Sequence, residues 1–493
     1  MGLAPLHFGT ELELLDKAIK SGNKVYVLKC NTGYASCYFN PCHNLIGCAI
    51  CTARTDRFHD LLQIPKDQIF SIQHLLKEKQ IQLPTFNHLN DLLDYEFEGI
   101  NVGRGVASSV ISLERDYAIL DNERQQELIN VQLEMAINAL LNYRQIIEQV
   151  RPDEVYFFNG RFAEQFPMVE YCKNQNIPFF SHERGSSQQK YQVFDNALPH
   201  SIVSRQEIMA QLWQSSEKSI AETKAKKWFT DKRKGQALDD KSYLGLQKAD
   251  QLPTSFDSKK HNIAIFNSSE DEMKAIGEWE TPLYQHQNEV IQRLIEYFDK
   301  QDINVHFILR MHPNLGKVNN QQTKELYNLR SKNLTLIGPF EKVDSYALAE
   351  ACDQILTFAS TIGIEATFWN KPSILFGKAF YDNLDAVYTP KSFEALCKLI
   401  GTHDLVPKPK ANTYQYGYFM ANFGTSFKKF NYDGKFNSSF SKIKLDRITF
   451  KTLIHLIGSF TQFPIWWKLN KIIFNRRLNL KDLFRLKSHT HND

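Results

Sequence analysis

The stretch LTFASTIGIEATFWNKPSILFGKAFYDN, residues 356–383, has two short apolar runs separated by a turn that is rich in hydroxyl groups. The first run ends at Phe358, and the pattern Ser-Thr-x-Gly-x-Glu follows at residues 360–365. The second run begins at Ser373, directly after a Lys-Pro pair. An order of strand, turn, helix and strand with short connections is typical of a parallel α/β sheet.

The turn itself has the composition of a nucleotide site. Ser360 or Thr361 would cap a helix that contains Gly363, and the free backbone N–H groups at such a helix end favour a phosphate. Glu365 places a carboxylate where ribose hydroxyls could donate hydrogen bonds. Each residue also has an ordinary explanation, because Ser and Thr often only cap helices and a first-turn Glu often only interacts with the helix dipole.

Two earlier strands end in polar turns of the same kind. Strand 261–266 is followed by Ser268, and the strand that ends at Arg310 is followed by His312 and a proline. A histidine ring can donate a hydrogen bond to a phosphate, and the proline stiffens the loop. Because the carboxyl ends of parallel strands lie at one edge of a sheet, we predict that these residues and residues 360–365 together bind a nucleotide-sugar.

The second half of the chain alternates between helix and strand throughout. The predicted strands are 261–266, 304–310, 334–337, 354–358 and 373–376, and the predicted helices are 282–299, 321–330, 345–352 and 361–369. No GxGxxG or GxxxxGK[ST] motif opens either half, which disfavours a dinucleotide oxidoreductase and a P-loop ATPase.

The first half follows the same order with fewer strands. The predicted elements are strands 24–30, 154–158 and 177–181, helix 122–150, and a Gly- and Ser-rich loop at 99–109. Two α/β halves of similar size predict two Rossmann-like domains that face a central cleft. We expect an amino-terminal acceptor-side domain at 1–255, a nucleotide-sugar-binding domain at 256–430 and a basic amphipathic tail at 431–493.

Length and composition limit the class of protein. The chain has 493 residues, which is too long for one ordinary core. A formal net charge of +4 gives no sign of a nucleic-acid partner, and residues 1–10 lack the pattern of a signal peptide. No apolar run of 18 or more residues is present, so a cytoplasmic location without a membrane span is expected.

Five of the eight cysteines lie between residues 30 and 51. Disulfides are not expected in the cytosol. Cys37, Cys42, Cys48 and Cys51 are candidate ligands of a structural zinc ion, and the alternative is that they pack as small apolar side chains. No catalytic metal and no cofactor is expected.

The polar turns of the second half carry a family resemblance. The motifs are Arg310-Met311-His312-Pro313, Ser360-Thr361-x-Gly363-x-Glu365-Ala366, Asn370-Lys371-Pro372-Ser373, and Phe376-Gly377 with Phe380-Tyr381. This set resembles bacterial capsule and surface-polysaccharide glycosyltransferases, among them the Kdo transferases of capsule synthesis. The His-Pro and Ser-Thr pairs are also similar to bacterial sialyltransferases and to CDP-glycerol phosphotransferases.

The resemblance implies a two-domain GT-B fold in which the His-Pro and Ser-Thr motifs contact the nucleotide phosphate. The first half would then supply the acceptor side. Glu183 follows a strand and is the candidate base, although the corresponding sialyltransferase motif has two acidic residues before its glycine. Arg184 and Arg161 could bind an anionic sugar or an acceptor phosphate, and a structural pairing of Glu183 with either arginine is the alternative.

The last part of the chain is basic and rich in aromatic residues. Residues 431–493 carry 12 Lys or Arg and four Asp or Glu, with Trp466 and Trp467 among the apolar residues. This composition is typical of interfacial amphipathic helices, and the alternative is a tail that packs back on the domains. We expect a protein at the inner face of the cytoplasmic membrane, bound peripherally to an anionic surface.

The leading hypothesis is a glycosyltransferase that moves a sugar from a CMP-sugar, Kdo-like in character, to a capsule or other surface polysaccharide acceptor that is lipid-linked. The alternatives are a CDP-alditol phosphotransferase, a UDP-sugar transferase or epimerase, and a non-catalytic subunit of polysaccharide assembly.

Overall fold

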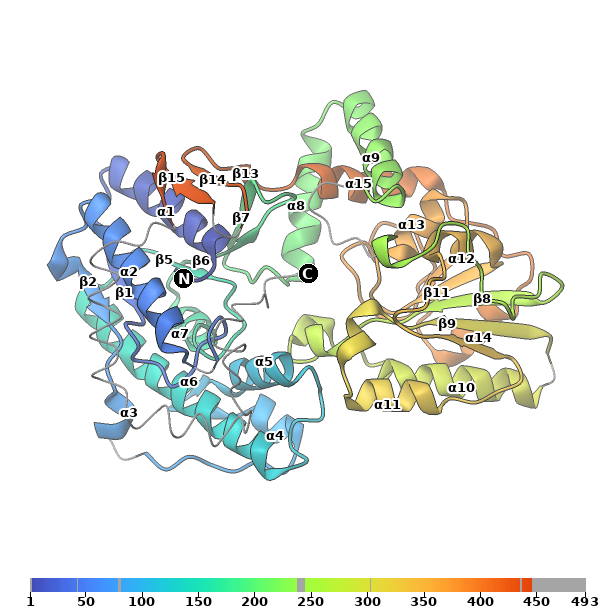
Figure 1. Cartoon of the computed structure of the whole chain (residues 1–493), viewed down its shortest axis with the longest axis horizontal. Coiled ribbons are helices and arrows are strands. Elements are labelled where there is room, and N and C mark those ends of the chain that lie inside the picture. The colour runs from blue at the N-terminus through green and yellow to red at the C-terminus, as the bar shows by residue number, and fades with distance from the viewer. Residues whose placement is uncertain are drawn as a thin grey trace. The chain divides into compact units, whose positions relative to one another are not determined.

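The computed structural model describes residues 2–445 except residues 42, 79, 80, 237–243, 302, 435 and 436. The chain forms two compact units (Figure 1). Unit 1 comprises Met1–Leu113, Ile119–Pro199 and the described residues from Gly424 onward, and unit 2 comprises Glu114–Ala118 and His200–Phe423. The chain therefore passes from one unit to the other four times.

Unit 2 is built on a five-stranded parallel sheet. Its strands are β8 (His261–Phe266), β9 (Val305–Arg310), β10 (Leu334–Ile337), β11 (Gln354–Thr357) and β12 (Ser373–Leu375). The order is β10-β9-β8-β11-β12, and all neighbours run parallel. This order reverses between β8 and β11, which is the Rossmann-like arrangement in which ligands bind beyond the carboxyl ends of the strands. The parallel α/β class predicted for the second half is thus confirmed.

The buried strands explain why this sheet is recognisable in the sequence. Alternate residues of β8 face opposite layers: Ile263 and Ile265 pack with helix α10 (Gln287–Lys300), whereas Ala264 and Phe266 pack with α12 (Ser345–Ala351) and α13 (Ile362–Phe368). Figure 1 shows α10 on one side of the sheet and α12 and α13 on the other. Since both faces are covered, each strand is a nearly continuous apolar run.

Three helices of unit 2 pack on one another: α8 (Ile202–Gln214), α9 (Lys218–Arg233) and α15 (Tyr414–Asn422). The unit also contains α11 (Gln321–Asn328) and α14 (Phe393–Ile400). Phe229 of α9 and Met209 of α8 share a core cluster with Tyr416 and Phe419 of α15. This packing joins residues 200–235 to unit 2, whereas the sequence placed the boundary at residue 255.

Unit 1 has smaller sheets. Its strands are β1 (Val27–Lys29), β2 (Ile69–Ser71), β3 (Glu96–Phe97), β4 (Ile100–Asn101), β5 (Val155–Phe158), β6 (Phe179–Arg184), β7 (Lys190–Asp195), β13 (Thr425–Ser426), β14 (Phe430–Tyr432), β15 (Ser438–Phe440) and β16 (Ile443–Lys444). The largest sheet has the order β13-β7-β6-β5, in which β5 and β6 are parallel and the other neighbours are antiparallel.

A helix of unit 1 lies where the sequence predicted a loop. The helices of this unit are α1 (Pro5–Lys20), α2 (Leu45–Leu61), α3 (Leu75–Glu78), α4 (Leu89–Leu93), α5 (Gly103–Glu114), α6 (Glu123–Val150) and α7 (Phe166–Gln175). The predicted loop at 99–109 is therefore wrong from Gly103 onward. A Cβ at Gly103 would lie 1.7 Å from the carbonyl oxygen of Leu92, so this glycine is needed for close packing of a helix start rather than for a flexible loop.

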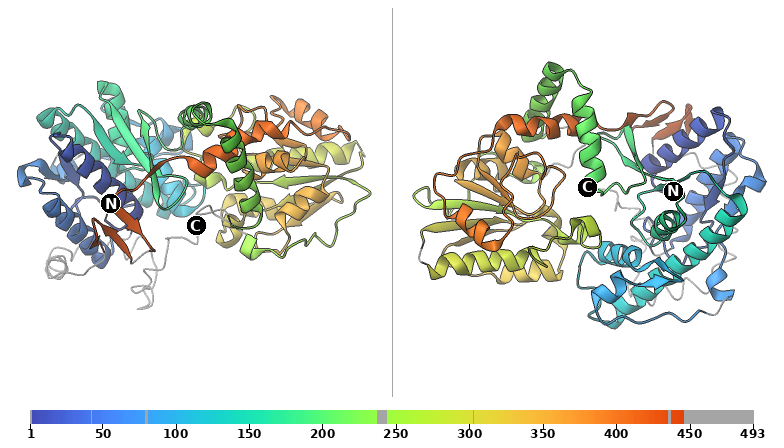
Figure 2. Two further views of the ribbon diagram at one scale, coloured as in Figure 1. Left: turned by 90° about the horizontal axis from the view of Figure 1, so that it is seen from above. Right: turned by 180° about the vertical axis from the view of Figure 1, so that it is seen from behind.

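The chain returns to unit 1 after residue 423, and the returning segment completes two sheets. β13 pairs with β7, and β14 and β15 lie against α1 (Figures 1 and 2). The described residues of the predicted tail, 431–445, thus pack within unit 1. Residues 446–493, on which the prediction of amphipathic tail helices depends, lie outside the described residues.

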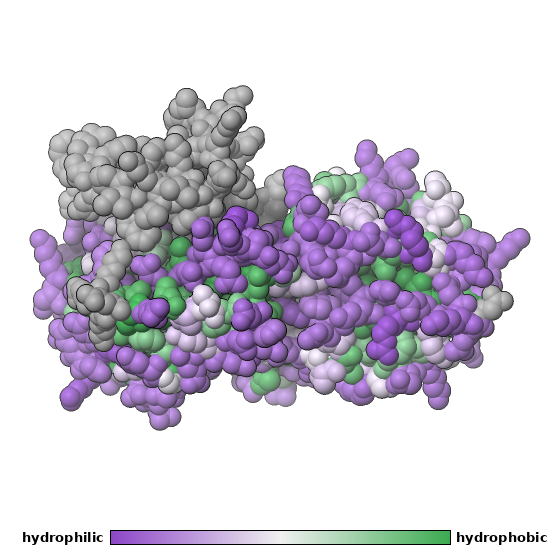
Figure 3. Space-filling model, turned by 90° about the horizontal axis from the view of Figure 1, so that it is seen from below, coloured by the Kyte–Doolittle hydropathy of each residue, from purple (hydrophilic) through white to green (hydrophobic). Residues whose placement is uncertain are grey.

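The face of the molecule in Figure 3 is largely hydrophilic, with hydrophobic residues in small groups between polar ones. Within the described parts of the chain, no helix is both long enough and apolar enough to span a bilayer.

Candidate functional site

Three polar turns follow strands of unit 2 at the carboxyl edge of its sheet. They begin at Asn267 after β8, at Met311 after β9 and at Phe358 after β11. Strands β8 and β11 flank the point where the strand order reverses, so the first and third turns lie on the two sides of the position where such sheets bind ligands. We call these turns the carboxyl-edge loops.

Hydrogen bonds of the backbone and of the ring fix His312 in the loop after β9. Its backbone N–H donates to Asn267 Oδ1 at 2.8 Å, and the backbone N–H of Asn314 donates to its Nδ1 at 3.2 Å. Because Nδ1 accepts a hydrogen bond, a neutral His312 ring carries its proton on Nε2. Donation of a hydrogen bond from Nε2 to a phosphate stays a prediction.

Ser268 lies in the loop after β8 and is fixed through its backbone. Its N–H donates to Gln287 Oε1 at 2.9 Å, and its carbonyl accepts from Gln287 Nε2 at 2.6 Å and from Gln322 Nε2 at 2.8 Å. Its hydroxyl is buried and has no hydrogen-bond partner in the described structure. An unpaired buried hydroxyl costs free energy, so a ligand that supplied a partner would be favoured.

The loop after β11 differs in detail from the predicted cap. α13 begins at Ile362, and the Thr361 hydroxyl donates to Glu365 Oε1 at 2.8 Å instead of capping the helix. Ser360 Oγ accepts from the N–H of Ile362 at a long 3.4 Å. A Cβ at Gly363 would lie 2.6 Å from the hydroxyl oxygen of buried Tyr381, so this glycine serves close packing under the turn.

Glu365 is more buried than its predicted contact with ribose requires. The residue is 2% exposed, and its carboxylate accepts from the Tyr346 hydroxyl as well as from Thr361. Lys232 Nζ lies 3.9 Å from Oε1. In this arrangement Glu365 holds the loop that carries Ser360 and Thr361.

Arg310 is the last residue of β9 and is 3% exposed. Its guanidinium donates to the carbonyl oxygen of Gly338 at 2.7 Å, and its Nε has no partner among the described residues. Burial lowers the pKa of Arg310, and the nearby Glu341 carboxylate opposes that shift. Arg310 thus bridges the ends of β9 and β10.

A five-residue segment from the first half of the chain, residues 114–118, belongs to unit 2 and joins this edge, which no local sequence pattern indicated. Arg115 Nε donates to buried Asp271 at 2.6 Å, and its guanidinium also donates to the carbonyl oxygen of Asn314 at 3.3 Å. The backbone N–H of Gln321 donates to Asp116 Oδ2 at 3.1 Å. Residues 114–118 therefore tie the loops after β8 and β9 together.

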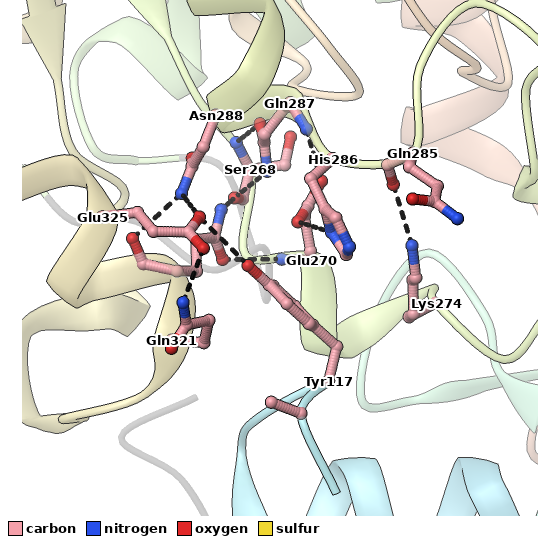
Figure 4. A network of polar contacts seen from close by, with 12 residues as sticks. Tyr117, Ser268, Glu270, Lys274, Gln285, His286, Gln287, Asn288, Gln321 and Glu325 are labelled. Carbon is pink, nitrogen blue, oxygen red and sulfur yellow. Dashed lines mark hydrogen bonds and ion pairs between the residues drawn. The ribbon is translucent and has the colours of Figure 1, made fainter. Parts of the chain in front are cut away.

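The same segment brings an aromatic ring into a polar network (Figure 4). Tyr117 stacks on His286 with 4.2 Å between ring centroids, and its hydroxyl donates to Glu325 at 3.2 Å. His286 Nδ1 lies 3.2 Å from Glu270, which also accepts the backbone N–H of Gln287 at 2.7 Å. The network fixes the start of α10 beside the carboxyl-edge loops.

The predicted acceptor-side residues come together at the carboxyl end of β5 and β6 in unit 1. Glu183 Oε2 accepts from Asn159 Nδ2 at 2.9 Å, and Oε1 accepts from the backbone N–H of Arg184 at 3.0 Å. His7 of α1 places Nδ1 3.5 Å from Glu183 Oε1. We call His7, Asn159, Glu183 and Arg184 the Glu183 cluster; His7 is a member that the sequence did not indicate.

The surroundings shift both titratable groups of this cluster. Burial raises the pKa of Glu183, but His7, the backbone N–H of Arg184 and Asn159 together bring that pKa below its ordinary value. Burial lowers the pKa of His7 below 6.5, Glu183 opposes this shift, and Arg184 adds to it. Glu183 is therefore ionised at neutral pH, and His7 is neutral.

Arg161, the third residue predicted for the acceptor side, and His182 of β6 have different surroundings. Arg161 donates to the hydroxyl of Ser108 at 3.1 Å and stacks over Phe162 at 4.3 Å. His182, inside β6, is 1% exposed, and burial lowers its pKa to about 3. It is thus a neutral core histidine.

The cysteine cluster does not assemble a metal site among the described residues. No group of three or more His, Cys, Asp or Glu side chains there could hold a metal ion, and this includes Cys37, Cys48 and Cys51. Cys42, the fourth candidate ligand, lies outside the described residues. Burial raises the pKa of Cys48 to about 12, as expected of a packed thiol.

The comparison with protein families bears on unit 2. Residues 279–385 match the capsule polysaccharide biosynthesis protein family. The matched segment contains His312, Ser360, Thr361 and Glu365, so it covers the loops after β9 and β11. The similarity to capsule synthesis proteins that the motifs indicated is thereby confirmed over this segment. Among curated proteins, none matches the chain significantly.

Solved structures give weaker similarities. The KpsC β-Kdo 2,4-transferase of Thermosulfurimonas dismutans is 13% identical over 55% of this chain and 87% of its own, with a TM-score of 0.38. The β-Kdo 2,7-transferase of the same KpsC is 12% identical over 65% and 90%, with a TM-score of 0.33. The UDP-GlcNAc 2-epimerase of Neisseria meningitidis, bound to UDP-GlcNAc, is 15% identical over 76% and 85%, with a TM-score of 0.24.

Proposed function

We propose that the chain is a glycosyltransferase of capsule or other surface polysaccharide synthesis, which takes a sugar from a nucleotide donor. The observation that carries the proposal is the coincidence of the family match at 279–385 with the polar loops after β9 and β11. The second support is the Glu183 cluster, since a neutral histidine beside an ionised carboxylate is suited to removing a proton.

The two units have different roles in this proposal. In unit 2, His312 donates from Nε2 to the donor phosphate, Ser268 and Ser360 offer hydroxyl groups, and Arg310, Glu365 and residues 114–118 hold the loops in place. In unit 1, the Glu183 cluster activates the acceptor hydroxyl, and Arg161 and Arg184 attract an anionic group. The proposed donor is a CMP-sugar, Kdo-like in character, and the proposed acceptor is a lipid-linked glycan.

A thermal-shift screen tests the donor class. A ligand that binds only the folded protein raises its melting temperature, by an amount that grows with the ratio of concentration to Kd. We expect CMP to give a larger shift than CDP, UDP or GDP. A larger shift with CDP would favour an alditol phosphotransferase, one with UDP a UDP-sugar enzyme, and no shift with any of them a non-catalytic assembly subunit.

His312→Ala should weaken CMP binding by about 1–3 kcal/mol, which is the range for a hydrogen bond to a charged group. Isothermal titration calorimetry measures this as a Kd increase of about 5- to 150-fold. The matched control is His88→Gln, because His88 is exposed and lies in unit 1. An unchanged Kd for folded His312→Ala would remove His312 from the donor site.

The proposal includes peripheral binding to an anionic membrane through residues 446–493. Nine Lys or Arg and three Asp or Glu follow Leu445, and each basic residue near an anionic surface contributes about 1 kcal/mol. Full-length protein should sediment with anionic liposomes at low salt and be released at 1 M salt, where the screening length falls to about 3 Å.

The control is a shortened protein that lacks residues 446–493, and the packing of Leu445 determines where it ends. Leu445 is 2% exposed and packs with Phe8 and Phe58 in unit 1, so the shortened protein must end after it and not before it. We expect this protein to stay in the supernatant at both salt concentrations. Full-length protein that remains in the supernatant at low salt would contradict membrane binding.

A further inference from the structure

An acidic run follows the loop position that is proposed to offer a hydroxyl group to the donor. Residues 270–272 are Glu-Asp-Glu, and Ser268 lies two residues before them. Asp271 is buried, whereas its two neighbours are partly exposed. A buried carboxylate without a countercharge would repel a phosphate that bound beside it, because charges interact strongly where water is excluded. We therefore expect this loop to accept a nucleotide phosphate only when the charge of Asp271 is compensated.

The flanking carboxylates have partners on neighbouring segments. Glu270 accepts the backbone N–H of Gln287 at 2.7 Å, and His286 Nδ1 lies 3.2 Å from it (Figure 4). Glu272 accepts from the side chain of Asn314 at 2.7 Å. These contacts direct both outer carboxylates to the start of α10 and to the loop after β9, so the buried middle carboxylate is the one whose countercharge matters most.

Arg115 supplies that countercharge from a distant part of the sequence that belongs to the same unit. Its Nε donates to Asp271 Oδ2 at 2.6 Å, and its Nη2 donates to the carbonyl oxygen of Asn314 at 3.3 Å. The backbone N–H of Asn314 in turn donates to His312 Nδ1 at 3.2 Å. One guanidinium thus contacts both the loop after β8 and the loop that carries His312.

The backbone of Arg115 has a conformation that favours glycine. The residue follows the last residue of α5, and its φ is 56°, in the left-handed region where glycine is common after a helix. Its carbonyl oxygen accepts from Asn320 Nδ2 at 2.5 Å, and the neighbouring Asp116 accepts the backbone N–H of Gln321 at 3.1 Å. The turn itself gives no reason for an arginine, whereas the pairing with Asp271 does.

The two side chains of the pair differ in exposure. The Arg115 side chain is 39% exposed, and that of Asp271 is 3% exposed. The pair therefore presents its cation to solvent and encloses its anion. An anionic group that approaches the pair from solvent meets its positive end, which is the polarity that a phosphate site needs.

We propose that Arg115 is a positioning residue of the donor site, which neutralises buried Asp271 and so allows the loops after β8 and β9 to accept a nucleotide phosphate. This inference rests on the proposed glycosyltransferase function. It assigns the charge balance of the donor site to a residue outside the family-matched segment 279–385. Arg115 acts through the charge of Asp271 and through the loop of His312.

A double-mutant cycle on the full-length protein tests this role, with the Kd of CMP measured by calorimetry. Arg115→Gln keeps a hydrogen-bond donor and removes the charge. It should weaken CMP binding by about 10- to 100-fold, which is the size expected of one uncompensated charge several ångströms from a phosphate. Arg115→Lys keeps the charge and should lose less affinity than Arg115→Gln.

The direction of the Asp271 effect separates charge compensation from a purely structural role. Asp271→Asn removes the anion and leaves the guanidinium, so it should bind CMP at least as tightly as the wild type does. In Arg115→Gln/Asp271→Asn both charges are absent, and the Kd should return to within about threefold of the wild-type value. If the pair only held the loops in shape, each of these variants would bind CMP more weakly.

Arg330→Gln is the matched control. Arg330 is exposed in unit 2 and precedes β10, at the opposite edge of the sheet from the carboxyl-edge loops. This variant should bind CMP as the wild type does. If Arg115→Gln does not fold, the comparison of Asp271→Asn and of the double variant with the wild type still decides, because neither contains a buried carboxylate at residue 271.

The outcomes separate this inference from the function on which it rests. A folded Arg115→Gln with unchanged CMP affinity overturns the role of Arg115 alone, and so does weaker binding by both Asp271→Asn and the double variant. A wild type that binds no CMP overturns the proposed CMP-sugar donor before any variant is compared, and the role of Arg115 falls with it.

Discussion

Glu183→Gln should lower the transfer rate by about 10²–10⁴-fold and leave nucleotide affinity unchanged. Glutamine keeps the size and shape of the side chain, and its single carbonyl oxygen can still accept from Asn159 Nδ2 or from the backbone N–H of Arg184, although not from both. What it lacks is the negative charge that lies 3.5 Å from His7 Nδ1 in the wild type. Without that charge the Glu183 cluster has no ionised carboxylate with which to draw the proton from the acceptor hydroxyl.

The measurement is kcat for CMP release from CMP-Kdo, together with the Kd of CMP from calorimetry. Glu154→Gln is the matched control, because Glu154 is exposed just before β5 in the same unit. A folded Glu183→Gln protein with a normal rate would place the base outside this cluster. Glu114 and Asp116 would be the next candidates for the base, and of these the Asp116 carboxylate already accepts the backbone N–H groups of Ala118 and Gln321.

The sheet of unit 2 was predictable because its signal is local. Strand β8 was predicted at residues 261–266 and is found there, since a strand buried on both faces is a continuous apolar run bounded by polar turns. The polar loops follow from the same fact, because parallel strands bring His312 and Ser360 to one edge whatever the details of the helices between them.

Other features depend on contacts that no local pattern records. β7 has no continuous apolar run, because it is a half-buried antiparallel strand, and it was not predicted. The contact of His7 with Glu183 can be recognised only in the folded protein, where α1 packs near the end of β6. The contacts of Arg115 likewise depend on residues 114–118 belonging to unit 2. Glu365 was predicted to face a ligand from its position one turn into a helix, but the distant Tyr346 and Lys232 occupy its carboxylate.

A buried acidic residue of α1 holds the segment that returns to unit 1 after residue 423. Glu13 of α1 is 7% exposed, and its Oε1 accepts the backbone N–H groups of three consecutive residues, including Lys428 at 3.0 Å and Phe430 at 2.8 Å. Lys429 also pairs with Asp16 at 2.6 Å. These bonds anchor β14 to α1, and the preceding β13 extends the sheet that contains the Glu183-bearing strand β6.

Glu13→Ala should therefore destabilise this anchor by about 2–4 kcal/mol, since it leaves backbone donors without partners and only the more exposed Lys428 can turn to water. Native-state hydrogen exchange resolves such a local change, and the amides of residues 428–430 should exchange about 30- to 900-fold faster. Glu13→Gln keeps a carbonyl acceptor and should show a smaller increase, whereas the exposed Glu127→Gln on α6 should show none. Unchanged exchange at residues 428–430 in Glu13→Ala would mean that the apolar contacts of Phe430 with Phe8 and Phe58, and not the carboxylate, hold the segment to α1.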